Sequence, residues 1–344
     1  MNTESVSKSS NDSADASDVK APSKEMMALL HQLMEEDSSL PDPTTLSAAE
    51  GRKLAIQNNK RWNAELPVVK RTDELAFRAA DGHTIRGRMF TPKTVEPGLI
   101  LFIHGGGFAF CNIETHERCA RLLANEAHCS VLSIDYRLAP EHPYPAGLQD
   151  CITVFRQLQK VQEKYPTTNG PIAVAGDSAG ANLALALIIN EQSLCRPAPD
   201  FALLFYGVYG TDFNTRSYIE FQNGPGLTRA KMMRYIDWYI EPAVRDDPLV
   251  APLSASDEVL RRLPPLYLNA AEIDPLCSDT ELLAERLQQS GRKDEVQVVS
   301  GVVHGFMQMT LRLPAACRAT TDAANAFRRF AGHQRTHETT RSSP

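Results

Sequence analysis

A serine flanked by two glycines, in the stretch Gly-Asp-Ser178-Ala-Gly, is the first candidate for chemistry. The apolar run 172–175 precedes this stretch and an Ala- and Leu-rich run follows it, which predicts a strand, a sharp turn and a helix. A serine on such a turn stands above the edge of a sheet, and the two glycines let the strand and the helix pass closely. Ser178 is therefore a candidate nucleophile for acyl transfer, and a chance match of the pattern is the alternative.

Three consecutive glycines, in the stretch His104-Gly-Gly-Gly-Phe108, directly follow an apolar run. Glycine loses more conformational freedom on folding than any other residue, so three in a row are expected where backbone N–H groups must approach a ligand closely. We predict an oxyanion hole formed by the N–H groups of Gly106, Gly107 and Ala179, the residue after the serine. A flexible tight turn is the alternative. His104 itself is expected to support the loop and not to act as a base.

A serine hydroxyl needs a base, and the chain holds nine histidines. In folds with this serine turn, the base lies in a loop at the same sheet edge and follows both the serine and the acid in chain order. His304 meets this condition, because it comes just after the predicted strand 296–300 and has glycines close on both sides. His333 and His337 lie in a polar segment near the end of the chain, and the earlier histidines are assigned to solvent or to local hydrogen bonds. We therefore predict that His304 is the base.

The acid that orients this base should follow the preceding strand. Asp274 comes after the apolar stretch that begins at residue 266, and Pro275 bars the continuation of regular structure. Glu272 and Asp279 are rivals. Asp279 falls where the next helix should begin, so capping of that helix or a favourable contact with its dipole is the expected role. We predict that Asp274 fixes the tautomer of the histidine and stabilises its charged form.

The elements that must position these residues begin at about residue 73, where short β-branched or aromatic runs start to alternate with longer helical patterns. The first two runs flank Asp81-Gly82, a tight-turn dipeptide, and predict an antiparallel hairpin. Several later runs are almost wholly apolar, as expected of strands covered on both faces. This alternation predicts an α/β fold with a parallel sheet wrapped by helices. The predicted strands are residues 74–78, 84–91, 98–103, 130–135, 172–175, 201–206, 265–270 and 296–300.

Two regions outside this pattern predict a cap. Residues 23–36 and 47–66 have helical apolar spacing and are separated by prolines. Nearly sixty residues, including the helical pattern 229–240, lie between two successive predicted strands, although a crossover needs only about a dozen. We combine both regions into one cap. The predicted organisation is a flexible tail at 1–23, the N-terminal part of the cap at 24–72, a catalytic domain at 73–333 with a cap insertion at about 212–250, and a flexible tail at 334–344.

The composition of the 344-residue chain excludes several other classes of protein. Hydrophobic residues make up 42% and charged residues 23%, which excludes a wholly disordered chain. The formal net charge is −6 and no dense basic stretch is present, so nucleic acid is not expected as a partner. No apolar run is long enough to span a membrane and no secretion signal is visible, so we expect a cytoplasmic protein. The seven scattered cysteines form no Cys-x-x-Cys pair, and we expect buried thiols and no metal site.

Taken together, these motifs resemble the hormone-sensitive-lipase family of α/β-hydrolase esterases, over about residues 73–330. The aspartate before the serine is similar to the bacterial subgroup with the sequence Gly-Asp-Ser-Ala-Gly, and the long Ser- and Asp-rich start departs from the family pattern. The motifs that carry the resemblance, in family order, are HGGGF at 104–108, DYRLAPEHPYPA at 135–146, GDSAG at 176–180, DPL at 274–276 and HGF at 304–306.

The resemblance implies an α/β-hydrolase fold: a mostly parallel eight-stranded sheet flanked by helices, with a helical cap. It implies that Ser178, Asp274 and His304 form a triad, with the oxyanion hole named above. The implied enzyme is a serine carboxylesterase that hydrolyses short- to medium-chain acyl esters with water through an acyl-serine intermediate, without a cofactor. The resemblance further implies a homodimer joined through edge strands.

Specificity is open at this point. Phe108, Tyr209 and Phe306 are candidates to line an apolar substrate pocket, and ordinary core packing is the alternative for each. A bulkier lactone, a carbamate or an amide, cleaved by the same triad, is the alternative substrate class. A non-catalytic small-molecule receptor is the remaining alternative, and the presence of His304 beside a serine and an acid argues against it.

Overall fold

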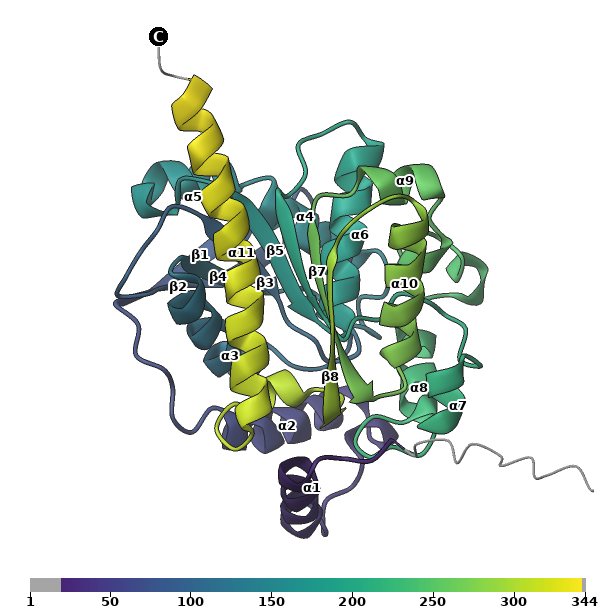
Figure 1. Cartoon of the computed structure of the whole chain (residues 1–344). Helices are drawn as coiled ribbons and strands as arrows, with labels where there is room; N and C mark the ends of the chain where they lie inside the picture. Colours follow the sequence, from purple (N-terminus) through teal and green to yellow (C-terminus); the bar gives the residue numbers. More distant parts are fainter. Residues whose placement is uncertain (1–19, 342–344) are drawn as a thin grey trace, which may run out of the picture.

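An eight-stranded sheet forms the centre of the computed structural model, which describes residues 20–341 of the chain, with side chains up to Gln334 (Figure 1). Its strands are β1 (Arg71–Arg78), β2 (Thr84–Thr91), β3 (Leu99–Ile103), β4 (Ser130–Asp135), β5 (Ile172–Asp177), β6 (Phe201–Phe205), β7 (Leu266–Ile273) and β8 (Glu295–Val303). Their order is β1-β2-β4-β3-β5-β6-β7-β8. The hairpin β1-β2 and the pair β2-β4 are antiparallel, and every other pair is parallel. The predicted fold class and all eight predicted strands are thus confirmed, with ends that differ by a few residues.

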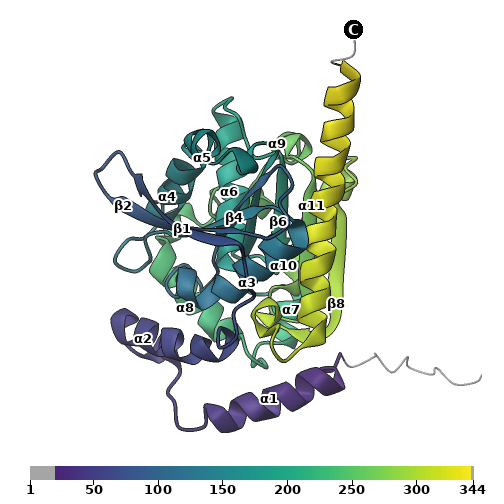
Figure 2. The same cartoon turned by 90° about the vertical axis from the view of Figure 1, so that its left-hand side faces the viewer.

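Helices cover both faces of the sheet, which explains why β3 and β6 are apolar and buried at every position (Figures 1 and 2). The core on one face includes α3 (Ile113–Ala127) and α11 (Pro314–Arg341). The core on the other face includes the remaining helices that flank the sheet. These are α4 (Ala146–Phe155), α5 (Leu158–Lys164), α6 (Ala179–Ser193), α9 (Asp257–Arg262) and α10 (Cys277–Gln289).

The two regions predicted to form a cap lie together at the carboxyl edge of the parallel strands (Figures 1 and 2). They contain α1 (Lys24–Glu36) and α2 (Ala48–Asn59) from the N-terminal region, and α7 (Arg216–Glu220) and α8 (Arg229–Tyr239) from the insertion. An ion pair of 3.1 Å between Asp42 and Lys231 joins the two regions.

Arg52 links the cap to the body of the molecule. The Arg52 guanidinium of α2 donates to the carbonyl oxygens of Ala109 and Ala139, each at 2.7 Å, and pairs with Glu141. Because these carbonyls belong to the loops after β3 and β4, the N-terminal region is attached to the segment that follows the glycine run.

Several element ends differ from the sequence expectation. The expected helix 47–66 ends at Asn59 and continues as a short 3₁₀ turn. Residues 334–341, expected as a flexible tail, continue α11. The shorter 3₁₀ elements are η1 (Pro43–Thr45), η2 (Lys60–Trp62), η3 (Pro166–Thr168), η4 (Pro242–Val244), η5 (Pro252–Ser254) and η6 (Phe306–Met309). Residues 1–19 and 342–344 of the expected tails lie outside the described residues.

Two further features concern the whole described chain. None of its helices combines the length and the hydropathy that a membrane-spanning segment requires. All seven cysteines are free. Cys129, Cys151 and Cys277 are buried as expected, whereas Cys195 is exposed, because it lies just beyond the C-terminus of α6.

Candidate active site

Ser178 lies at the junction of β5 and α6, on the turn that the sequence predicts. Its backbone is in the left-handed region, with φ 54°, which is uncommon for a residue other than glycine. The turn is tight: a Cβ added at Gly176 would lie 2.4 Å from the backbone of Gly180, and one added at Gly180 would lie 2.0 Å from the carbonyl oxygen of Ile103. The two glycines therefore allow the close crossing of strand and helix that presents Ser178 at the sheet edge.

His304 and Asp274 meet Ser178 at this edge. Nε2 of His304 lies 3.0 Å from Oγ of Ser178, and Nδ1 lies 2.6 Å from Oδ2 of Asp274. Both distances are within hydrogen-bond range, so the three side chains form a continuous chain of contacts. Asp274 is buried, follows β7 directly and accepts the N–H of Leu276 through its other oxygen at 2.9 Å. The ring of Tyr206 packs against His304 edge to face, with centroids 4.9 Å apart.

The glycine run after β3 lies beside the serine. Gly106 and Gly107 have φ angles of 116° and 59°, which only glycine adopts without strain. Within the described residues we find no acceptor for the N–H groups of these two glycines. Ala179 is the first residue of α6, where a helical N–H has no partner inside the helix. Three backbone donors are thus free to bind an oxygen atom next to Ser178.

The two rival acids have other partners. Asp279 accepts the N–H groups of Tyr209 at 2.7 Å and Gly210 at 2.8 Å, and burial raises the pKa of its carboxyl to about 7. It lies in the first turn of α10, where the expected contact with the helix dipole would place it. Its carboxyl group binds the loop after β6 and does not cap α10, so the expected capping role is wrong. Glu272 accepts the N–H of Gly301 at 2.8 Å.

His104 occupies a wholly buried position under the glycine loop. Its Nδ1 lies 2.8 Å from the carbonyl oxygen of Gly105, and its ring stacks on Tyr136 with centroids 4.5 Å apart. Burial and the neighbouring His116 lower the pKa of His104 to about 4, so the ring is neutral. The Tyr136 hydroxyl donates to the carbonyl oxygen of His104 at 2.9 Å. His104 therefore supports the loop and makes no contact with Ser178, as the sequence interpretation expects.

The three aromatic candidates for a substrate pocket are all fully buried. Phe108 stacks on Tyr239 with centroids 3.8 Å apart, and Phe306 packs against Tyr206. Tyr209 belongs to the core that includes α6 and α10. In this conformation each of the three is packed as a core residue.

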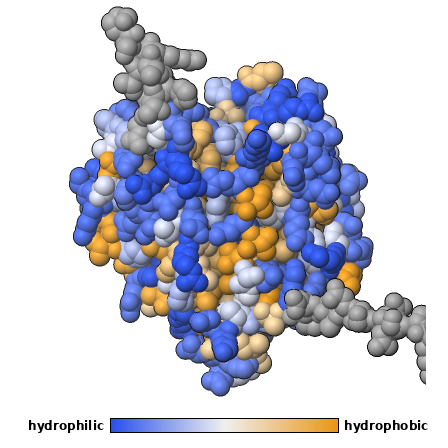
Figure 3. Space-filling model, viewed as in Figure 1, coloured by the Kyte–Doolittle hydropathy of each residue, from blue (hydrophilic) through white to orange (hydrophobic). Residues whose placement is uncertain are grey.

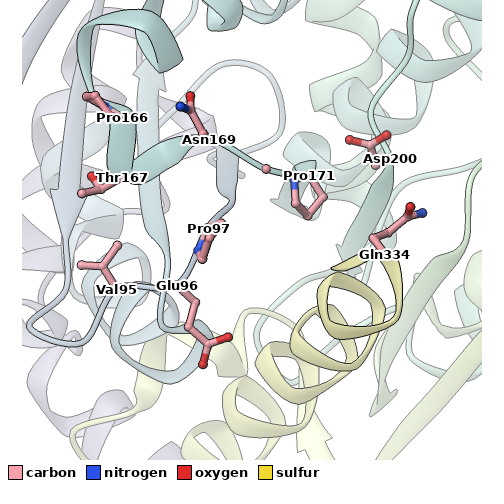
Figure 4. Close-up of a pocket in the computed structure, with 10 residues that line it drawn as sticks. Val95, Glu96, Pro97, Pro166, Thr167, Asn169, Pro171, Asp200 and Gln334 are labelled. Carbon is pink, nitrogen blue, oxygen red and sulfur yellow. The ribbon is translucent and has the colours of Figure 1, made fainter. Parts of the chain in front are cut away.

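A surface hollow of about 590 Å³ lies at the other end of the sheet (Figure 4). The hollow is lined by residues at the starts of three strands: Pro97 before β3, Pro171 before β5 and Asp200 before β6. Ser178 follows the end of β5, so this hollow is not part of the candidate site. Among the described residues there is no group of three or more His, Cys, Asp or Glu side chains that could hold a metal ion.

Sequence reasoning missed the partners that come from distant segments. His116 makes a local contact with the hydroxyl of Thr115 at 2.9 Å, in agreement with the local hydrogen bond expected as one alternative, but it is buried and also lies 3.3 Å from the carboxylate of Asp177, which the sequence does not predict. Tyr235 of α8 packs against Gly107, and Gln308 of η6 contacts His116. No spacing in the sequence connects these residues with the glycine loop, because their proximity is created by the packing of α3, α8 and η6.

Known proteins that are similar to this chain share its α/β-hydrolase fold. A family model described as alpha/beta hydrolase fold matches residues 100–308. An ester-hydrolase from the metagenome of Lake Arreo, solved with a bipyridine phosphonate derivative, is 32% identical, with a TM-score of 0.84 over 90% of this chain and 99% of its own. A hyperthermophilic esterase from the archaeon Pyrobaculum calidifontis is 30% identical, with a TM-score of 0.83 over 90% of this chain and 99% of its own. A second alpha/beta hydrolase from the Lake Arreo metagenome is 32% identical, with a TM-score of 0.82 over 88% of this chain and 96% of its own.

Proposed function

The chain belongs to the hormone-sensitive-lipase family of α/β hydrolases, and from this membership we propose that it is a serine carboxylesterase acting on short- to medium-chain acyl esters. The observation that carries the proposal is the pair of contacts made by His304. One ring nitrogen lies 3.0 Å from the Ser178 hydroxyl and the other 2.6 Å from the Asp274 carboxylate. A base that is oriented on one side and in contact with a hydroxyl on the other is the arrangement that activates a serine.

The first half of the reaction transfers the acyl group to the protein. Oγ of Ser178 attacks the ester carbonyl carbon while its proton passes to Nε2 of His304. The negative charge that forms on the carbonyl oxygen is held by the N–H groups of Gly106, Gly107 and Ala179. The tetrahedral intermediate then loses the alcohol, which takes the proton from His304, and the acyl group remains bonded to Oγ.

The second half repeats these steps with water. His304 removes a proton from the water molecule as its oxygen attacks the acyl carbon, and the same three N–H groups hold the oxyanion. The intermediate releases the carboxylic acid, and Oγ of Ser178 recovers its proton from His304. Asp274 accepts Nδ1–H throughout, which stabilises the charged imidazole in both halves.

A covalent probe tests the nucleophile. A fluorophosphonate should label the wild-type chain at Ser178, and Ser178→Ala should neither be labelled nor hydrolyse p-nitrophenyl butyrate. The thermal melt of this variant should stay close to that of the wild type, since the substitution removes a single oxygen atom. Labelling elsewhere, or a variant that retains most of its activity, would contradict the assignment.

Substrate range is tested by a series of p-nitrophenyl esters from acetyl to palmitoyl. We expect the highest kcat/KM between two and eight carbons, and a matched series of anilides should be cleaved far more slowly because an amine is a poorer leaving group. If kcat/KM were highest for the longest acyl chains, or higher for the anilides than for the esters, the proposed substrate class would be wrong.

We also propose that the chain forms a homodimer through β8, the edge strand of the sheet. Val296 and Val298 of this strand are 47% and 44% exposed, and apolar surface is visible on this face of the molecule (Figure 3). An exposed strand edge with apolar side chains is a template for pairing with a second copy. The molar mass in solution tests this: light scattering should give twice the 38.0 kDa of the chain, and Val298→Lys should shift the mass towards the monomer.

A further inference from the structure

A second aspartate–histidine pair lies behind the nucleophile, in addition to Asp274 and His304. Asp177, the residue before Ser178, is 4% exposed, and its Oδ1 accepts the N–H of Gly105 at 2.8 Å. The same oxygen lies 3.3 Å from Nε2 of His116, which is 1% exposed. The carboxylate therefore contacts both the loop that holds the oxyanion donors and a buried imidazole from α3.

His116 connects this carboxylate with the loop of the catalytic base. The Thr115 hydroxyl donates to the carbonyl oxygen of Asn112 at 2.7 Å and accepts the N–H of Asn112 at 3.0 Å. Its second lone pair is left to accept from Nδ1 of His116, which lies 2.9 Å away. Nε2 of His116 then faces two different groups: the carboxylate oxygen Oδ1 of Asp177, an acceptor at 3.3 Å, and the side-chain amide nitrogen of Gln308, a donor at 2.7 Å. Gln308 belongs to η6, the turn that begins two residues after His304.

The burial of these groups has an energetic consequence. Burial opposes the ionisation of Asp177, but His116 and the N–H of Gly105 outweigh it and lower the pKa of the carboxyl below its ordinary value. A carboxylate kept ionised inside a protein depends on its partners, because removing one of them leaves a buried charge uncompensated. The contacts of Asp177 are therefore costly to break.

The loop rests closely on this carboxylate. A Cβ added at Gly105 would lie 2.5 Å from Oδ2 of Asp177, so the loop backbone is in direct contact with the side chain. The next two residues in the chain are Gly106 and Gly107, the proposed oxyanion donors. A displacement of about 1 Å at such donors lowers the rate strongly, because the stabilisation of an oxyanion depends on short, well-aimed hydrogen bonds.

We propose that Asp177 and His116 are positioning residues that hold the oxyanion loop, the Ser178 turn and the His304 loop in one fixed arrangement. The inference rests on the proposed function, because its effect is exerted on ester hydrolysis. Neither side chain contacts Oγ of Ser178 in the structure. Their action passes through Gly105 on one side and Gln308 on the other.

The test compares two substitutions at His116. His116→Phe fills the space but cannot bind Asp177 or Gln308, whereas His116→Gln retains a polar group close to the position of Nε2. With p-nitrophenyl butyrate, His116→Phe should lower kcat about 10-fold or more while KM stays within twofold, because the lost alignment affects the transition state. The affinity for a trifluoromethyl ketone, which forms an oxyanion on Ser178, should fall in parallel. His116→Gln should recover part of both losses.

A matched control separates positioning from loss of core packing. Leu123→Ala truncates a buried apolar side chain on the same helix, about two turns further along, and should lower the melting temperature without changing kcat or the ketone affinity. If His116→Phe reduces kcat no more than Leu123→Ala does, the proposal is wrong. If His116→Phe does not fold, Gln308→Met at the partly exposed end of the network replaces it, and an unchanged kcat in that variant overturns the proposal equally.

Failure of the proposed function would look different. In that case the wild type would show no more ester hydrolysis than Ser178→Ala, and the ketone would not bind. A wild type that hydrolyses the ester, together with His116 variants of full activity, would leave the esterase proposal intact and exclude the positioning pair alone.

Discussion

The ring of Tyr235 lies directly against the backbone of Gly107, so closely that a Cβ at this glycine would come within 2.4 Å of the ring. Tyr235 belongs to α8 of the cap, and Gly107 carries one of the proposed oxyanion donors. Phe110 packs against the same ring, with centroids 5.7 Å apart. The cap therefore contacts the glycine loop at Gly107, and Asp177 binds the same loop at Gly105.

Gly107→Ala should lower kcat by about 10²-fold or more, because the new methyl group must displace either the loop or Tyr235 and move an oxyanion donor. The control is Gly82→Ala, which has a similar positive φ of 87° but no neighbour within 4 Å. Both variants should lose about 1–2 kcal/mol of stability from backbone strain. Steady-state kinetics with a short-chain ester distinguish them, since only Gly107→Ala should lose activity. Equal activity in the two variants would contradict the assigned donor.

Asp274→Asn should lower kcat by about 10⁴-fold, because an amide cannot hold His304 in the tautomer that accepts the serine proton. Asp279→Asn is the matched control: the carboxylate is also buried and only five residues away, but it contacts backbone N–H groups instead of the histidine. We expect Asp279→Asn to retain wild-type kinetics. If the two substitutions had effects of similar size, Asp274 would not be the acid of the triad.

Asp279 should also make stability depend on pH. Because burial raises the pKa of its carboxyl to about 7 in the folded state, the folded protein keeps a proton there at pH values where the unfolded chain has lost it. This contribution to stability is fully present below about pH 4 and is lost as the pH rises towards 7. Asp279→Asn cannot ionise, so its melting temperature should rise relative to that of the wild type between pH 5 and pH 8. A constant difference over this range would show that Asp279 does not titrate there.

Arg137 should be essential for stability. It donates to the fully buried carboxylate of Asp150 through its backbone N–H at 2.9 Å and through its guanidinium at 2.7 and 2.9 Å. Arg137→Met should cost about 3–5 kcal/mol, because it leaves the carboxylate buried without its charged partner. Arg216→Met, which breaks an exposed pair with Glu281, should cost less than about 1 kcal/mol. Urea unfolding of the two variants measures the difference, and similar losses would argue against a special role for the buried pair.

The parts of the fold that sequence reasoning predicted well are those whose signal is local. The apolar strands, the Asp81-Gly82 hairpin and the serine turn each have a pattern within a few residues, and all are present in the structure. The convergence of Ser178, Asp274 and His304 could be predicted because parallel strands bring their carboxyl ends to one edge of the sheet. The geometry of the three side chains agrees with that expectation, and their catalytic role stays a prediction that the substitutions above test.

The residues that sequence reasoning missed depend on packing between distant segments. His116 lies 61 residues before Asp177 in the chain and is brought to it by the packing of α3 on the sheet. The three aromatic candidates show the same limit. Phe108 and Phe306 are close in sequence to site residues and Tyr209 follows the strand β6, but the structure buries all three. Whether an aromatic side chain faces a substrate or the core is decided by its neighbours in space, which a single sequence does not specify.

The hydrogen bonds from Arg52 to the carbonyl oxygens of Ala109 and Ala139 matter when the protein is truncated at its N-terminus. A recombinant form that starts after α2 would keep every member of the proposed triad and every glycine of the loop, and would still match the family model at residues 100–308. It would lack the Arg52 guanidinium, which binds the backbone just after those glycines at Ala109. A screen that expresses only residues 100–308 would therefore remove an interaction that holds the loops after β3 and β4 in the full chain.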